Sequence, residues 1–192
     1  MEINLTNKII FKDSVYMFRD AVDPIVAQKI LLQLGIDYSL KHFEPKQKLD
    51  SDIFTYNFEQ LMTLNNDIKT YVYSDDFHKL VSEQTGIEVS KTLSCWASAY
   101  SKGHYLTPHT DAIKDRKVAY IFYFNAEWRP HWGGNIAFEK DDHWIMIPPM
   151  HGSMMLFDVR DSKNRHMVTP VWSDETRHIC LKIDLPDTVN LS

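Results

Sequence analysis

From about residue 91 onward, the chain changes to short runs of β-branched and aromatic residues, and this change limits the available folds more than any other feature. The runs span residues 92–100, 118–125, 135–139, 144–147, 153–159, 166–171 and 177–184. Turn-forming sequences such as Trp132-Gly133-Gly134 and Pro148-Pro149 separate them. Many short strands with turns between them are typical of an antiparallel barrel or a jelly roll. We therefore expect a mainly β core over about residues 91–184.

The preceding residues show helical patterns instead. Asp23-Pro24, an apolar stretch and Gly35 predict a capped helix, with the aspartate at its start and the glycine at its end. Two more helical patterns occupy residues 58–71 and 75–85, and Gly86 ends the second. Residues 43–55 are polar and irregular, which suggests a mobile flap. We expect a single domain over residues 1–192, in which a helical support of about residues 1–90 packs against the β core.

Composition excludes several classes of protein. A chain of 192 residues with 44% hydrophobic residues can bury a sizeable core in one domain. The net charge of −5 is spread along the chain without a basic stripe, so no nucleic-acid partner is expected. No apolar run approaches the roughly 18 residues of a membrane span, and the N-terminus has no basic leader. Cys95 and Cys180 lie in apolar runs as expected for buried free thiols, which favours a reducing, cytoplasmic setting.

A small set of polar residues interrupts this apolar pattern in the β region. His109-Thr110-Asp111 is followed by His166 and then by Arg177. The His-x-Asp triplet alone carries little weight, because chance predicts about one in a chain with this many histidines and aspartates. Its significance comes from the residues that follow it in order.

The triplet and the distal histidine have the composition of an iron site. Two imidazoles and one carboxylate bind one face of Fe(II) and leave the other positions open for a chelating co-substrate and O2. If residues 106–111 form a strand, His109 and Asp111 share a face while Thr110 points away. His166 and Arg177 would begin the last two strands, so all four side chains could face the interior of one jelly roll.

On these residues the chain resembles the Fe(II)- and 2-oxoglutarate-dependent dioxygenases, and among them the prolyl hydroxylases that act on a ribosomal protein. The unbroken stretch from His109 to Asn125 is similar to their metal-binding strand and the next strand. Trp132-Gly133-Gly134-Asn135-Ile136 resembles their Gly-Gly turn, and His166-Met167-Val168 with Arg177 resembles their distal histidine and arginine. The resemblance covers about residues 92–184 and implies a double-stranded β-helix (a cupin-like jelly roll) buttressed by helices, without the second jelly-roll domain of the eukaryotic members.

The resemblance also implies roles for individual residues. His109, Asp111 and His166 would be the catalytic iron ligands. Arg177 would hold the distal carboxylate of 2-oxoglutarate, since its rigid fork matches a carboxylate in two parallel hydrogen bonds. Tyr123 would add a phenol hydrogen bond, and Tyr100 would line the same pocket. The cofactors implied are Fe(II), 2-oxoglutarate and O2, with ascorbate as a reductant.

The substrate does not follow from the resemblance. Asn164-Arg165 before His166 and Leu181-Lys182 after Arg177 depart from the family pattern near the substrate mouth. Hydroxylation of a prolyl residue in a protein or peptide, with release of succinate and CO2, is the first hypothesis. Hydroxylation of a free amino acid or small metabolite is the second, and a non-catalytic jelly-roll binding module is the third. The oligomeric state is left open.

One further loop requires a choice between two interpretations. Residues 127–132, with His131 among them, place aromatic and basic groups where the resemblance puts the site. The simpler alternative is a hairpin loop whose aromatic side chains fold onto the barrel. The other histidines show no metal-ligand spacing and are expected to be structural or exposed.

Overall fold

The computed structural model describes residues 2–51, 54–61, 67–92, 94–112, 116–125, 127–160, 163–174 and 177–186, with the backbone alone for Asp67 and for the last of these ranges. Its helices are α1 (Pro24–Ser39), α2 (Asp67–Val72), α3 (Asp75–Thr85) and the short 3-10 turn η1 (Pro130–Trp132). Its strands are β1 (Lys8–Lys12), β2 (Val15–Phe18), β3 (Glu44–Lys48), β4 (Tyr56–Leu61), β5 (Ala97–Tyr100), β6 (Tyr105–His109), β7 (Arg116–Tyr123), β8 (Ile136–Lys140), β9 (His143–Ile147), β10 (Met154–Asp158), β11 (His166–Val168) and β12 (Arg177–Pro186).

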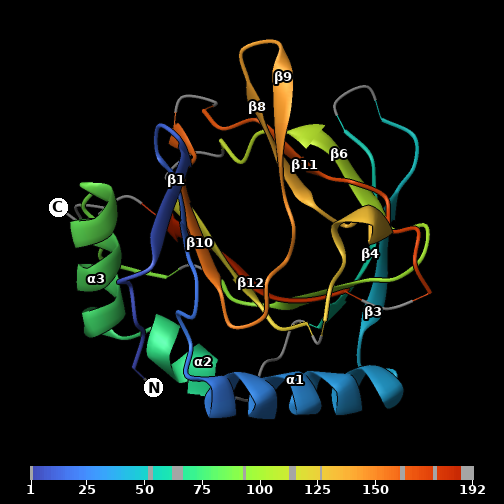
Figure 1. Ribbon diagram of the computed structural model, residues 1–192, viewed down its shortest axis with the longest axis horizontal. Coiled ribbons are helices and arrows are strands. Elements are labelled where there is room, and N and C mark those ends of the chain that lie inside the picture. The colour runs from blue at the N-terminus through green and yellow to red at the C-terminus, as the bar shows by residue number, and fades with distance from the viewer. Residues whose placement is uncertain are drawn as a thin grey trace, which may run out of the picture.

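The strands form one connected antiparallel sheet. Its order is β1-β2-β10-β7-β12-β5-β4-β6-β11-β8-β9, and β3 pairs with β4 beside this path. β4 pairs with β5 through residues 59–61 and with β6 through residues 56–57. This single strand therefore joins the group that contains β7 and β12 to the group that contains β6 and β11. Figure 1 shows the sheet curling around an interior, with the helices along its lower and left edges.

The central strands are apolar on both faces because each face covers a different core. In β10, Met154 and Leu156 pack towards the helices, whereas Met155 and Phe157 point into the barrel. Both faces of β7 are buried in the same alternating way. A strand buried on two sides appears in the sequence as a continuous apolar run. This explains why the expected core strands over residues 118–125 and 153–159 are confirmed.

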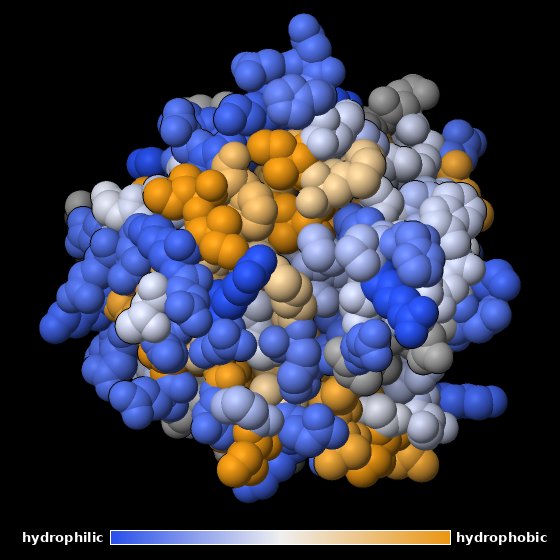
Figure 2. Space-filling model, in the orientation of Figure 1, coloured by the Kyte–Doolittle hydropathy of each residue, from blue (hydrophilic) through white to orange (hydrophobic). Residues whose placement is uncertain are grey.

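The helices close the outer face of the sheet. Ala27, Ile30 and Leu34 of α1 are buried in the outer core, together with residues of α2 and α3. α1 begins as predicted, because the Asp23 Oδ1 accepts hydrogen bonds from the backbone N–H groups of Ile25 and Val26 at 2.9 and 3.1 Å. Its opposite face carries exposed apolar side chains, visible as orange atoms along the lower edge of Figure 2; they are Ile25, Leu32, Ile36 and Leu40.

Two predicted helix ends differ in outcome. The expected end of α1 at Gly35 is wrong, because the helix continues to Ser39 and the Leu40 N–H reaches the Ile36 carbonyl at 2.9 Å. Gly35 has no positive φ, so it does not act as a stop signal. The expected end of α3 at Gly86 is confirmed, since that glycine adopts a left-handed conformation with φ 69° and caps the helix.

The N-terminal ninety residues depart most from expectation. The region expected to be a helical support also supplies β1 to β4. The helix expected over residues 58–71 is wrong for residues 58–61, which belong to β4, whereas α2 is helical and residues 62–66 lie outside the described residues. The expected irregular flap over residues 43–55 contains the regular strand β3, paired with β4 over five residue pairs. Burial of the aromatic face of β4 against the barrel outweighs local helix propensity there.

The cysteines and the helices bear on the expectations of buried thiols and of no membrane span. Cys95 is a buried free cysteine, and burial raises the pKa of its thiol to about 12. The side chain of Cys180 lies outside the described residues. Within the described part of the chain, none of the helices has the length and apolar character needed to cross a bilayer.

The turn at Gly133 gives a test of the fold. Gly133 has φ 76°, and a Cβ built on it would lie 1.9 Å from the Pro170 carbonyl oxygen. Gly103 also has a positive φ, of 83°, but a Cβ there meets nothing within 4 Å. We expect Gly103→Ala to lower the free energy of unfolding by about 1–2 kcal/mol, the cost of a left-handed alanine, and Gly133→Ala to lower it by more. Urea denaturation measures both, and equal losses would contradict the steric argument.

Candidate metal and co-substrate site

The two predicted histidine ligands lie directly opposite each other on neighbouring strands. His109 is the last residue of β6 and His166 is the first residue of β11, and the two are paired in the antiparallel register. Their ring centroids are 4.3 Å apart. Only 8% of His109 and 3% of His166 is exposed. Residues 57 positions apart in the sequence are therefore held side by side by backbone pairing alone.

Backbone carbonyls fix the tautomer of both rings. The His109 Nδ1–H donates to the Thr107 carbonyl at 3.0 Å, and the His166 Nδ1–H donates to the Asn164 carbonyl at 2.9 Å. Because a carbonyl oxygen can only accept, each Nδ1 must carry the proton. In a neutral imidazole this leaves Nε2 with a lone pair, as a metal ligand requires.

Asp111 completes the cluster. Its Oδ1 lies 3.5 Å from the His109 Nε2 and its Oδ2 lies 3.4 Å from the His166 Nε2, and the carboxylate is buried. One ligand atom from each of the three residues falls within 4.8 Å of the others. A convergent pair of imidazole lone pairs and one carboxylate fits a divalent metal of the Fe(II) type.

The position of Thr110 differs from the expectation. β6 ends at His109, so Asp111 lies beyond the strand, and Thr110 contributes to the wall of the cavity in front of the cluster. The strict alternation expected over residues 106–111 therefore stops at His109, whose partner His166 is itself the first residue of β11. Asp111 still reaches both histidines.

A left-handed residue orients the carbonyl that holds His166. Asn164 has φ 55° and is buried, and its Nδ2 donates to the Asp158 carbonyl at 2.8 Å and to the Ser14 Oγ at 3.1 Å. The Asp158 carboxylate in turn accepts two side-chain hydrogen bonds from Arg160, each 3.0 Å long. Burial acts to raise the pKa of Asp158, but the hydrogen bonds and charge of Arg160 and the charge of Lys163 outweigh it and lower the pKa. The ionised carboxylate of Asp158 thus stabilises the turn that precedes His166.

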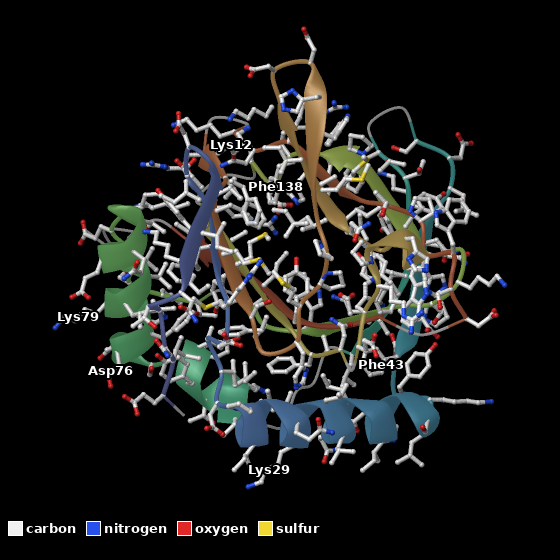
Figure 3. The ribbon with its side chains drawn as sticks, viewed as in Figure 1. Lys12, Lys29, Phe43, Asp76, Lys79 and Phe138 are labelled. Carbon is white, nitrogen blue, oxygen red and sulfur yellow. The ribbon has the colours of Figure 1, made fainter. Side chains whose placement is uncertain are left out.

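Aromatic rings enclose both histidines. Phe54 stacks on the His109 ring at a centroid distance of 5.3 Å, while Phe157 and Phe138 contact the His166 ring at 5.0 and 5.5 Å. Phe138 is fully buried and points into the barrel (Figure 3). The rings therefore have little freedom to rotate away from the metal position.

The cluster opens into a cavity of about 490 Å³ inside the barrel. Most of its lining residues come from β3 to β7 and from β8 and β11: Lys46, Phe54, Tyr56, Phe58, Gln60, Trp96, Ser98, Tyr100, Leu106, His109, Thr110, Asp111, Arg116, Ile121, Ile136, His166 and Val168. A concave, largely apolar site with a few converging polar groups is the usual form of a small-molecule pocket. Its size suits a co-substrate together with part of a substrate.

One wall of the cavity is a continuous row of aromatic rings. From the metal cluster, Phe54 contacts Tyr56 at 5.8 Å, Tyr56 contacts Phe58 at 5.5 Å, and Phe58 stacks on Tyr100 at 5.3 Å. Tyr56 and Phe58 lie two apart on β4 and so share its inward face. This wall connects the iron-type cluster to the predicted co-substrate residue Tyr100.

The other predicted co-substrate residues lie on the strands beyond this wall. Tyr100 lines the cavity, and the backbone of Arg177 pairs directly with it. Tyr123 is fully buried in the inner core, and its backbone pairs with Ile179 of β12. The side chain of Arg177 lies outside the described residues, so only its place in the register is fixed here.

His131 does not belong to the site. It lies in η1 and is exposed, and it is absent from the cavity wall. The Trp128 Nε1–H donates to the Gly133 carbonyl at 3.0 Å, and the Trp128 ring packs edge-on against Trp132. The simpler interpretation of residues 127–132, a loop with folded aromatic side chains, describes the structure.

Sequence reasoning missed the contribution of the N-terminal hairpin. Lys46 on β3 and the aromatic residues before and within β4 all line the cavity, as does Arg116 at the start of β7. A signal was present in Tyr56-Asn57-Phe58-Glu59, where aromatic and polar residues alternate as they do on a half-buried strand. No comparable signal marks Lys46 or Arg116.

Comparison with known proteins agrees with this geometry. Residues 95–181 match the model of the 2OG-Fe(II) oxygenase superfamily. The match covers a little under half of the chain, so this region is similar to the 2OG-Fe(II) oxygenases. Proteins of that superfamily use Fe(II), 2-oxoglutarate and O2, and the His-Asp-His cluster of this chain fits such a metal.

The chain is similar to two proteins named prolyl 3-hydroxylase OGFOD1. It is 27% identical over 176 residues to the one from Xenopus laevis, covering 84% of this chain and 33% of that protein. It is 24% identical over 139 residues to the one from Mus musculus, covering 66% of this chain and 25% of that protein. The chain thus spans between a quarter and a third of the length of these relatives.

Solved structures establish the fold. A prolyl hydroxylase from Trichoplax adhaerens, in complex with a peptide fragment of the hypoxia inducible factor oxygen degradation domain, has a TM-score of 0.75 at 16% identity, covering 92% of this chain and 84% of that one. A Pseudomonas putida prolyl-4-hydroxylase has a TM-score of 0.72 at 14% identity, covering 91% and 93%. The expected mainly β jelly-roll core with supporting helices is confirmed.

The attachment of the hairpin beside the metal cluster gives a second test. The Thr107 Oγ1 accepts from the Thr55 N–H at 2.7 Å and donates to the Thr55 carbonyl at 3.0 Å. We expect Thr107→Val, which keeps the shape but loses the hydroxyl, to lower the free energy of unfolding by about 1–3 kcal/mol because the Thr55 N–H loses its partner. Thr107→Ser should keep most of this stability. Urea denaturation gives the loss, and faster hydrogen exchange at Thr55 in the Val variant alone would locate it.

Proposed function

We propose that this protein is a 2-oxoglutarate-dependent oxygenase that hydroxylates a prolyl residue in a protein or peptide, using iron held by His109, Asp111 and His166. The observation that carries the proposal is the convergence of these three buried ligand atoms at the inner end of an aromatic-walled cavity. The names of its sequence relatives and of its structural neighbours support the choice of proline. The overall reaction would convert 2-oxoglutarate, O2 and a C–H bond into succinate, CO2 and a C–OH group.

Each group of residues has a distinct task in this proposal. Bound Fe(II) supplies the O2 activation that oxidises 2-oxoglutarate and the substrate C–H bond. Thr107 and Asn164 keep both imidazoles in the metal-binding tautomer through their carbonyls. The aromatic row from Phe54 to Tyr100 would keep water away from the reacting C–H bond.

Arg177 and Tyr123 would bind 2-oxoglutarate at its distal carboxylate. Arg177 lies on β12 and pairs through its backbone with Tyr100, a wall residue on β5. Tyr123 lies on β7, which pairs with the other edge of β12. A guanidinium offers two parallel hydrogen bonds to a carboxylate, and a phenol adds a third donor. Tyr100 would contact the co-substrate from the aromatic side.

The metal assignment is tested by uncoupled turnover. Purified protein with Fe(II), ascorbate and 2-oxoglutarate should release succinate, whereas Asp111→Ala and His166→Ala should release almost none because a three-ligand site loses one ligand. His143→Ala and Asp142→Ala, which make the same changes at exposed positions of the β8–β9 hairpin, serve as controls. Equal succinate release from the Asp111 variant and the wild type would refute the site.

The co-substrate anchor is tested separately. We expect Arg177→Ala to weaken 2-oxoglutarate binding to the Mn(II)-loaded protein by about 3–5 kcal/mol, the cost of leaving a buried carboxylate without its charged partner. Arg177→Lys should recover part of the affinity, since lysine keeps the charge but not the fork. Calorimetric titration measures both values. An unchanged dissociation constant in the Ala variant would rule out this role.

The substrate class is tested by mass spectrometry. Incubation with prolyl peptides and, separately, with free amino acids should give an oxygen-dependent gain of one oxygen atom on peptides. A gain confined to a free amino acid would transfer the proposal to small metabolites. Peptide binding without any succinate would identify a binding module.

A further inference from the structure

Cationic side chains are prominent among the described residues that line the cavity. The protein has a net charge of −5, yet the cavity is lined by two cations, Lys46 and Arg116. Among the described lining residues, Asp111 is the sole carboxylate, and it belongs to the metal cluster. A concave site lined by cationic side chains favours anionic ligands.

Lys46 lies at the edge of the aromatic wall. On β3 it stands directly opposite Phe58, which stacks on Tyr100. Its side chain is 36% exposed and its Nζ lies 3.3 Å from the Glu44 Oε2, but the Glu44 side chain is 73% exposed. A pair with so exposed a partner contributes little free energy. A ligand carboxylate inside the cavity can therefore compete for this ammonium group.

Arg116 lies on the other side of the aromatic wall. It is the first residue of β7 and is half-buried, five residues after Asp111. Along the sheet, β4, β5 and β12 lie between the strands of Lys46 and Arg116. A guanidinium has five donors, so it can hold a ligand carboxylate together with other acceptors.

We propose that Lys46 and Arg116 are specificity-determining residues that select peptides with an acidic side chain next to the residue that is oxidised. An extended peptide lying over the aromatic row would place its target near the metal cluster and its flanking side chains near one cation or the other. Carboxylates meeting partly buried cations form the stronger class of hydrogen bond. The inference rests on the proposed function as far as the target is a prolyl residue.

The co-substrate would be a second anion in the same cavity. The co-substrate 2-oxoglutarate carries two carboxylates, so the two cations could serve its entry instead of peptide selection. The two roles predict different variant behaviour, because a steering role changes the KM for 2-oxoglutarate and leaves the peptide preference unaltered.

The test compares three peptides that differ only at the residues flanking one central proline, which are Glu, Gln or Lys. Binding to Mn(II)-loaded protein with 2-oxoglutarate is followed by fluorescence anisotropy of labelled peptides. We expect the Glu peptide to bind about tenfold more tightly than the Lys peptide, a difference of about 1.4 kcal/mol, and the ratio to shrink in high salt.

Single substitutions then assign the preference to its source. Lys46→Gln and Arg116→Gln should each reduce the ratio, and Lys46→Glu should bring it to one or below. Lys29→Gln is the matched control, because it removes the same charge from α1, where the lysine points away from the barrel (Figure 3). It should leave the ratio unchanged.

Two results would overturn the proposal. The first is equal affinity of the wild type for all three peptides. The second is a raised KM for 2-oxoglutarate in uncoupled succinate release by the Gln variants, with an unaltered peptide ratio. A further set of peptides with alanine in place of the central proline separates this inference from the proposed function. If these peptides keep the preference for acidic flanking residues and no peptide of either set is oxidised, the result supports the anionic subsite and removes the prolyl assignment.

Discussion

The antiparallel pairing of β6 with β11 is the constraint on which the site depends. It brings His109 opposite His166 without any contribution from their side chains. At both histidines, the carbonyl two residues earlier accepts the Nδ1–H; it belongs to Thr107 within β6 in one case and to Asn164 in the turn before β11 in the other. The same hydrogen bond, from a histidine Nδ1–H to the carbonyl two residues earlier, thus occurs twice, beside strands that run in opposite directions. Backbone geometry, which substitution of surface residues hardly affects, determines where both lone pairs point.

The rest of the barrel stabilises this arrangement, although burying its polar groups costs free energy. Two imidazoles and a carboxylate are buried beside Phe138 and Phe157, where an uncompensated polar group is unfavourable. A bound divalent cation would offset that cost, so metal binding and the folded state should favour each other. β10, whose Phe157 contacts the His166 ring, is buried on both faces, and its outer face packs in one core with α1 to α3, which provides the rigidity that such a site needs.

Features that depend on local sequence could be predicted, and features that depend on pairing could not. The β core was predictable because double-sided burial gives uninterrupted apolar runs, and Gly86 was predictable as a helix stop because a left-handed residue is needed there. The hairpin of β3 and β4 was missed, since Phe58, Leu61 and Met62 have the i, i+3, i+4 spacing of a helix when the strand on either side is unknown. The alignment of Lys46 with Phe58 and Tyr100 arises only from register across three strands. His109 and Asp111 formed a chance-level triplet until His166 was placed beside them.

The double pairing of β4 has a consequence for how this protein could acquire a new substrate. Many enzymes change specificity by exchanging a whole surface loop, because a loop can be lengthened or replaced without disturbing the scaffold. Here the strand that carries the aromatic wall also joins the two halves of the barrel, through β5 at one end and β6 at the other. Insertion or deletion of a residue within it would shift inward side chains outward and break that junction. Divergence at this wall is therefore confined to exchanging one side chain for another at fixed backbone positions.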